Sequence, residues 1–155
     1  PKNSVDLEGV YNEVWRNYRR NSITDFVRSV HDMIQTDEIE ISAAVKPDIR
    51  RATDYFLQDW PEWIEKGYLD FAVPMNYTPE MSTFQDNSIA IIKNVSKTSV
   101  VMGIGAYNQT EHSVSQKVQY ALENRFKGVC IFSYDSLIED PSYMALLKPY
   151  FRFAD

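Results

Sequence analysis

Polar side chains that could do chemistry follow four short apolar runs of the sequence, at the point where each run ends. They are Asp48, Asn76, Tyr77, Tyr107, Tyr134 and Asp135. Carboxylates act as acid, base or nucleophile, and hydrolysis of a glycosidic bond typically uses two of them, roughly 5–10 Å apart. Asparagine offers two donors and an acceptor, and tyrosine offers a ring and a hydroxyl. The set suits a polyhydroxylated ligand, with the two aspartates as candidate catalytic carboxylates and the other four residues as candidate binding residues.

Each carboxylate also has a structural interpretation. Asp48 and Asp135 both stand where they could cap the helix or turn that follows. Glu111 is a third carboxylate near a strand end, and the favourable interaction of an acidic residue with a helix N-terminus explains it better than catalysis does. The sequence leaves both interpretations of the two aspartates open.

Among the asparagine and tyrosine candidates, some also have a structural explanation and others do not. Asn76 and Tyr77 have no evident capping role, so we expect them in a site, whereas Tyr107 is also compatible with packing at the rim. Gly103 and Gly105 lie inside an apolar run, which favours close backbone approach or barrel curvature. A phosphate loop is not indicated, because the required strand, glycine-rich loop and helix do not follow one another.

Metals and cofactors have no signature here, and we expect none. The single cysteine, Cys130, excludes an internal disulfide and a cysteine-cluster metal site. It stands in an apolar run, so we expect a buried structural thiol. His31 and His112 are isolated from carboxylates or cysteines at ligand spacing.

Charge and hydropathy argue against two classes of partner. The net charge of −6 disfavours nucleic acid, and the cluster of Arg16, Arg19 and Arg20 is better explained as a solvated face or salt-bridge site. No apolar run approaches the roughly 18–20 residues that a membrane span needs. The N-terminus, from Pro1 to Ser4, has no signal-peptide pattern.

Parallel strands alternating with helices must position these residues. The expected strands are Ile39–Val45, Leu69–Pro74, Val100–Ala106 and Val129–Tyr134. They are continuously apolar rather than alternating, as in strands buried on both faces, and they recur about every 30 residues, the length of one unit of a (β/α)8 barrel. An open doubly wound sheet satisfies the same pattern. In both architectures ligands bind at the carboxyl ends of the strands.

Helix-period segments fill the gaps. We expect a helix from a capping box at Ser22 to Ile34, one around Phe56–Ile64 that is broken near Pro61 and capped by Asp59, one over Met81–Val95 with Ile89 facing inward, and one with the apolar stripe Val114, Val118, Ala121 and Leu122. Lys66-Gly67 and Lys127-Gly128 each precede a strand. We expect both glycines in the left-handed position that ends a helix.

One continuous stretch carries a resemblance to a known family. Residues 52–77 read ATDYFLQDWPEWIEKGYLDFAVPMNY, and they resemble the Gln-Asp-Trp, Trp, Gly, Asp and Pro-Met-Asn-Tyr pattern of the bacterial glycosyl hydrolase-like family 10. Trp15 with Arg19-Arg20, the stretch 103–107 and the stretch 128–134 also fit. Lys46 departs from the pattern, where an aromatic residue before Pro47 is more usual.

The resemblance implies a (β/α)8 TIM barrel that acts on glycosidic bonds, with some members similar to enzymes that cleave peptidoglycan. Residues 1–155 are then a single partial domain, a half-barrel of four β/α units equal to the C-terminal half. Key catalytic groups would belong to the N-terminal half. The resemblance also implies an exported protein, often a lipoprotein, in the periplasm or at the cell surface.

Three functions remain open from the sequence. The first is a glycoside hydrolase fragment, inactive alone, that acts on a bacterial or cell-wall polysaccharide by carboxylate acid/base catalysis. The second is a non-catalytic carbohydrate-binding barrel, and the third is a structural α/β domain. Because a half-barrel leaves sheet edges open, we expect a homodimer or larger assembly through these edges.

Overall fold

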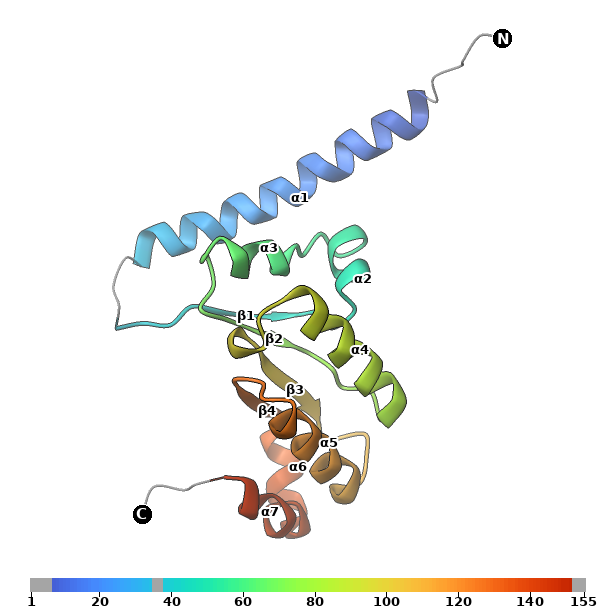
Figure 1. Cartoon of the computed structure of the whole chain (residues 1–155), viewed down its shortest axis with the longest axis vertical. Helices are drawn as coiled ribbons and strands as arrows, with labels where there is room; N and C mark the ends of the chain where they lie inside the picture. The colour runs from blue at the N-terminus through green and yellow to red at the C-terminus, as the bar shows by residue number, and fades with distance from the viewer. Residues whose placement is uncertain (1–6, 35–37, 152–155) are drawn as a thin grey trace.

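Four apolar runs form the strands of the structure, with helices between them (Figure 1). The computed structural model of the chain describes residues 7–34 and 38–151. Its elements are α1 (Leu7–Ile34), β1 (Ser42–Val45), α2 (Ile49–Asp54), α3 (Trp60–Glu65), β2 (Phe71–Pro74), α4 (Met81–Asn94), η1 (Lys97–Ser99), β3 (Val101–Gly105), α5 (Glu111–Glu123), β4 (Gly128–Phe132), α6 (Tyr134–Glu139), α7 (Pro141–Leu147) and η2 (Lys148–Tyr150). The predicted α/β alternation is confirmed.

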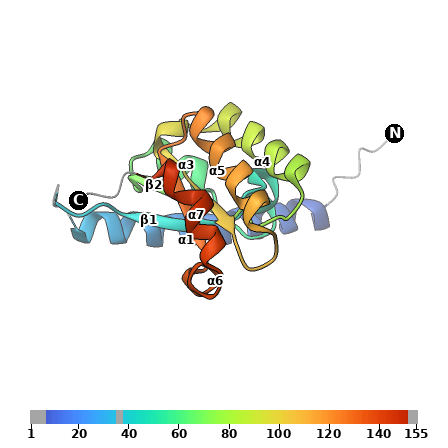
Figure 2. The ribbon, with the colours of Figure 1, turned by 90° about the horizontal axis from the view of Figure 1, so that it is seen from below.

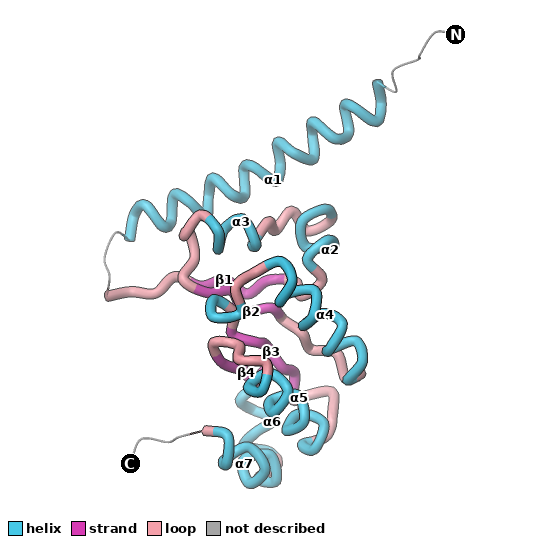
Figure 3. The backbone as a smooth tube through the Cα atoms, viewed as in Figure 1, coloured by secondary structure: helices cyan, strands magenta, loops and turns pink. Residues whose placement is uncertain are grey.

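The strands are parallel, and neighbours in the sequence are neighbours in space. β1 pairs with β2, and β3 pairs with β4. Isolated parallel bridges, Ala72↔Val100 and Met75↔Gly103, join the two pairs. Figure 3 shows the strands stacked in chain order. Consecutive parallel order with a helical segment after each strand is consistent with part of a (β/α)8 barrel.

The junction between β2 and β3 depends on Gly103. A Cβ atom at this position would lie 2.6 Å from the carbonyl oxygen of Pro74, closer than such atoms approach one another. The backbone N–H of Asn76 donates to the Gly103 carbonyl oxygen over 3.1 Å at the same place. The absence of a side chain therefore lets the two strand pairs meet, as expected for a glycine inside a strand.

The sheet has one covered and one uncovered face. Val45, Ala72 and Met102 are fully buried in the core, which also contains Trp60 and Phe84 from the helical side. Figure 2 shows α4 and α5 side by side along the sheet. On the opposite face the alternate residues, including Ser42, Ala44, Cys130 and Phe132, are exposed. The prediction of a buried Cys130 is wrong, because this residue points to the uncovered face.

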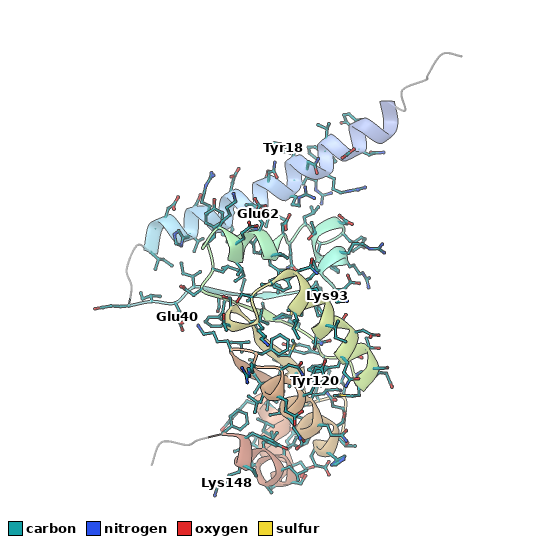
Figure 4. The ribbon with its side chains drawn as sticks, in the orientation of Figure 1. Tyr18, Glu40, Glu62, Lys93, Tyr120 and Lys148 are labelled. Carbon is teal, nitrogen blue, oxygen red and sulfur yellow. The ribbon has the colours of Figure 1, made fainter. Side chains whose placement is uncertain are left out.

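An ion pair spans the uncovered face near the amino ends of the strands. Lys127 immediately precedes β4 and Glu40 lies just before β1, yet their Nζ and Oε1 atoms are 2.7 Å apart. The Lys127 ammonium also lies 4.7 Å from the centroid of the Phe71 ring. Glu40 is labelled in Figure 4. The sheet is therefore curved enough for one lysine to reach from its last strand to the approach of its first.

α1 packs on α3 with only one of its sides. The indole N–H of Trp63 donates to the Thr24 hydroxyl over 2.9 Å, and Arg20 pairs with Asp59 at 3.6 Å. The opposite side carries an exposed apolar stripe, of which Tyr18 is labelled in Figure 4. Asp59 is the N-cap of α3, as predicted, but its carboxylate makes no capping hydrogen bond. The ion pair with Arg20 occupies it instead.

Two details of the predicted helices are wrong. α1 begins at Leu7 rather than at Ser22, whose hydroxyl donates to the Tyr18 carbonyl within the helix. Ile89 is 43% exposed, because α4 buries Phe84, Ser88 and Ile91 instead.

Of the two glycines predicted to end helices in the left-handed conformation, only one does so. Gly67 has φ +71° and is left-handed as predicted, whereas Gly128 is the first residue of β4. Arg125, with φ 60°, takes the left-handed position after α5. The apolar stripe of α5 is buried at Val114, Val118 and Ala121, but Leu122 is 38% exposed.

Candidate functional site

The carboxyl ends of the four strands form one edge of the sheet, here called the rim. The parallel register aligns Val45 with Pro74 and Gly105 with Phe132, and the bridge from Met75 to Gly103 aligns the inner strands. The predicted residues follow these ends: Asp48 after β1, Asn76 and Tyr77 after β2, Tyr107 after β3, and Tyr134 and Asp135 after β4. The six candidates therefore emerge along neighbouring parallel strands.

Three aromatic side chains meet at the rim on the uncovered side, and we call Tyr77, Tyr107 and Phe132 the rim cluster. The rings of Tyr77 and Phe132 are stacked, with centroids 5.4 Å apart and an interplanar angle of 5°. Tyr107 stands at right angles to both, at 6.2 Å from Tyr77 and 6.0 Å from Phe132. Tyr107 is 55% exposed and Phe132 is 51% exposed, so the cluster offers ring surface to a ligand.

Gly105 makes room for this cluster. A Cβ atom at position 105 would lie 3.1 Å from Tyr77 Cβ, 3.2 Å from Tyr107 Cε1 and 3.2 Å from Asn108 Oδ1. The Asn108 amide in turn donates to the Tyr77 carbonyl oxygen over 2.9 Å. The backbone of β3 therefore approaches both tyrosines because position 105 carries no side chain.

The hydroxyl of Tyr77 stays protonated over a wide pH range. Burial raises the pKa of Tyr77, and the neighbouring Cys130 and Tyr107 raise it further. A protonated phenol both donates and accepts hydrogen bonds. The rim cluster therefore combines ring faces with a hydroxyl suited to a sugar.

Asn76 is a buried connector in this structure. It is 1% exposed. Its amide group donates to the Phe84 carbonyl oxygen over 3.1 Å, and its side-chain oxygen accepts from the Asn87 amide over 2.9 Å. Both polar ends are thus engaged with α4, and Asn87 is the residue of this pair that reaches a surface pocket.

Asp48 caps α2, in agreement with its structural interpretation. One carboxylate oxygen accepts from the Arg51 backbone N–H over 2.9 Å, and the residue is exposed. Asp135 and Tyr134 are exposed in the first turn of α6, whose N-cap is Ser133. Glu111 lies in the first turn of α5, as its dipole interpretation predicts.

A buried lysine fixes the loop that follows β2. Lys117 on α5 is fully buried, and its ammonium donates to the carbonyl oxygens of Thr78 and Pro79 over 2.8 Å each. It also donates to the side-chain oxygen of Gln109, whose own amide donates to the Gly105 carbonyl. Burial lowers the pKa of Lys117 from 10.5 to about 8. This one side chain ties the loops after β2 and β3 together behind the rim cluster.

A polar pocket of about 340 Å³ opens at the β1 end of the rim, and we call it the β1 pocket. It is lined by Lys46, Pro47, Asp48, Arg51, Phe56, Thr83 and Asn87. These residues come from the end of β1, from α2 and the loop after it, and from α4, which lie next to each other in Figure 1. The β1 pocket and the rim cluster occupy different parts of the same edge.

Several of these residues were not predicted from the sequence. Phe132 belonged to an expected strand, and its ring is exposed only because that face of the strand is uncovered. Lys117 and Asn87 lie inside helices, where a buried lysine and a surface asparagine look alike in sequence. Arg51 follows Asp48 by three residues, and the sequence alone gave no reason to place it in a site.

Metal-ligand clusters and membrane-spanning helices can be sought only in the part of the chain that the structure describes. In residues 7–34 and 38–151, no three His, Cys, Asp or Glu side chains gather in a way that could hold a metal ion. None of the helices in the same ranges is both long and apolar enough to cross a bilayer.

A known protein family matches most of the chain. A family model described as glycosyl hydrolase-like 10 matches residues 3–122. The match includes Asp48, Asn76, Tyr77 and Tyr107, and ends before Phe132, Tyr134 and Asp135. No curated protein matches the chain.

Proposed function

The chain belongs to the glycosyl hydrolase-like 10 family, and from this premise we propose that its rim binds a glycan chain and acts on its glycosidic bonds. The family supports a glycosidase-like hydrolase domain. One observation carries the proposal, namely the half-exposed rim cluster at the carboxyl ends of three adjacent parallel strands. Ligand sites of parallel α/β folds lie at this edge.

The rim cluster suits the apolar faces of sugar rings. Tyr107 and Phe132 offer flat rings at right angles to each other, so two successive sugar units can each meet a ring. The Tyr77 and Tyr134 hydroxyls supply hydrogen bonds to sugar hydroxyls. In this proposal Asn76 contributes by holding the loop that carries Tyr77, through its bonds to Phe84 and Asn87.

The two candidate carboxylates, Asp48 and Asp135, lie at opposite ends of the rim. Asp48 follows β1 and Asp135 follows β4, so two strands lie between them. At about 4.8 Å per strand, these ends lie roughly 14 Å apart along the sheet. Paired glycosidase carboxylates lie roughly 5–10 Å apart. Each aspartate is therefore best tested singly as an acid or base.

The same spacing favours a second candidate function, which is glycan binding without hydrolysis. The capping bond of Asp48 agrees with this alternative, because it gives that carboxylate a structural role. The two candidates share the rim cluster and differ only in the chemistry that follows binding.

Binding to a panel of purified polysaccharides and glycan oligosaccharides tests the proposal. We expect Tyr107→Ala and Phe132→Ala each to weaken binding about tenfold, by analogy with the loss of other aromatic stacking contacts. Tyr18→Ala is the matched control, because Tyr18 is an exposed aromatic residue on α1, 63% exposed, and lies outside the rim cluster. Equal binding by all three variants would remove the rim cluster from the site, and release of reducing ends would separate hydrolysis from binding.

Location and assembly form part of the same proposal. We propose that the protein meets cell-wall or other extracytoplasmic polysaccharide, as a glycosidase-like protein of the periplasm or cell surface would. In the part of the chain that the structure describes, β1 pairs only with β2 and β4 only with β3, and exposed strand edges recruit further strands. We therefore expect a dimer at micromolar concentration in sedimentation experiments, and a clean monomer would contradict this part.

A further inference from the structure

We propose that the β1 pocket binds an anionic group, a carboxylate or a phosphate, and thereby directs the protein to acidic rather than neutral glycans. The pocket contains two cationic side chains, Lys46 and Arg51, and one carboxylate, Asp48. It is thus cationic in a chain whose net charge is −6. The reference to glycans rests on the proposed function, whereas the anion site rests on the pocket alone.

The two cationic side chains of the pocket do not form ion pairs with described residues. Among the described residues, the ion pairs involve Arg20, Arg28 and Lys127, and neither Lys46 nor Arg51 takes part. The Asp48 carboxylate is occupied by the Arg51 backbone N–H rather than by either cationic head group. Both positive charges therefore remain available to a ligand.

An aromatic ring holds both cations at the pocket. The Lys46 ammonium lies 4.8 Å from the centroid of the Phe56 ring, and the Arg51 guanidinium lies 5.7 Å from the same centroid. Cation–π contacts favour these positions without neutralising either charge. Two like charges held near one ring repel each other, and a bound anion relieves that repulsion.

Hydrogen bonds hold the residues that line the pocket in place. The Lys46 N–H donates to the Gln58 side chain over 3.0 Å, and the Lys46 carbonyl oxygen accepts from the Trp60 indole over 3.2 Å. On the other wall, Asn87 is held by its bond to the buried Asn76. Thr83 adds a hydroxyl to the lining. The site thus offers two charges and two neutral polar groups, which suits the several oxygens of a carboxylate or phosphate.

Titration with glucuronate, glucose and inorganic phosphate tests the anion site directly. We expect glucuronate or phosphate to bind and glucose to bind at least about tenfold more weakly, since hydrogen bonds to charged groups are the strong ones. Binding of glucuronate alone would assign a carboxylate, and binding of phosphate alone a phosphate. Equal binding of glucose and both anions would overturn the proposal.

Variants locate the effect in the pocket. Lys46→Gln and Arg51→Gln should each weaken anion binding about tenfold, whereas Lys46→Arg and Arg51→Lys should retain most of it. Arg50→Gln is the matched control, because Arg50 lies beside Arg51 on α2 outside the pocket. Equal loss in the control would contradict the assignment. Salt should weaken anion binding to the unmodified chain, which tests the charge effect even where a variant fails to fold.

The two proposals fail separately. If Lys46→Gln abolishes anion binding while Tyr107→Ala leaves glycan binding unchanged, the anion site in the β1 pocket is supported and the rim cluster is excluded as the glycan site. If glycan binding depends on Tyr107 but is equally strong for acidic and neutral chains, the rim cluster is supported and the role of the β1 pocket in selecting acidic glycans is excluded.

Discussion

The side-chain amide of Asn87 donates a hydrogen bond to the side-chain oxygen of Asn76 over 2.9 Å. This bond links a buried residue at the end of β2 to a residue that lines the β1 pocket. The rim thus has an inner layer that holds its loops and an outer layer that can meet a ligand. Substitutions in the inner layer should therefore change stability, and those in the outer layer should change ligand binding.

Replacement of Asn76 should affect stability first. Asn76→Ala leaves the Asn87 amide without its partner and removes one of the hydrogen bonds to the Phe84 carbonyl oxygen, which still accepts from the Ser88 hydroxyl. Since both bonds are buried or partly buried, we expect a loss of about 2–3 kcal/mol in the free energy of unfolding. Asn94→Ala is the control, because its exposed amide bonds only within α4, and it should cost about 0.5 kcal/mol. Denaturant unfolding measures both. Equal losses would show that the buried connection contributes little.

Replacement of Gly105 should disturb the rim cluster. In Gly105→Ala the new methyl group crowds Tyr77, Tyr107 and Asn108, so we expect altered near-ultraviolet circular dichroism and weaker glycan binding. Gly128→Ala provides the comparison, since a Cβ there meets nothing within 4 Å. A Gly105→Ala protein with the spectrum and binding of the unmodified chain would show that the cluster tolerates the displacement.

The buried Lys117 should give stability a specific pH dependence. Burial lowers the pKa of Lys117 from 10.5 to about 8, so between these pH values the unfolded chain binds a proton that the folded chain has lost. The contribution of Lys117 to the free energy of unfolding therefore rises as the pH increases from about 8 to 10.5, and it is constant well below pH 8.

Comparison with Lys117→Met measures this effect. The difference in unfolding free energy between the unmodified protein and the variant should grow from about pH 8 to about pH 10.5, while tyrosine titrations cancel because both proteins share them. The variant should also loosen the loop at Thr78 and Pro79, which hydrogen exchange would detect. A difference that stays flat over this range would contradict the lowered pKa.

Substitutions of Asp48 distinguish capping from catalysis. Asparagine also caps helices well, so Asp48→Asn should keep the bond to the Arg51 N–H, whereas Asp48→Ala should cost about 1 kcal/mol of stability. If Asp48 is the acid or base, both variants lose glycan turnover. Asp140→Asn is the control, because Asp140 caps α7 in the same way, through the Ser142 N–H at 2.9 Å, and lies outside the β1 pocket. Normal turnover by Asp48→Asn would leave capping as its role.

The sequence predicted the strands well because one face of the sheet contributes apolar side chains such as Val45, Ala72 and Met102 to the core. It could not predict strand order, since the same alternation suits a barrel and a doubly wound sheet. The burial of Cys130 was wrongly predicted for a similar reason, because an apolar run does not show which face of the strand is covered by helices. The rim positions followed from strand ends, but the inward turn of Asn76 and the roles of Lys117 and Asn87 depend on contacts between segments distant in sequence.

The close passage of Gly103 past the Pro74 carbonyl oxygen, at 2.6 Å from where a Cβ would stand, has a consequence for how this family can vary. Substitutions elsewhere on the sheet change one strand, but any side chain at position 103 must push apart two strand pairs that share little other hydrogen bonding. Related sequences with this arrangement should therefore keep glycine at that position even where every neighbouring residue has drifted.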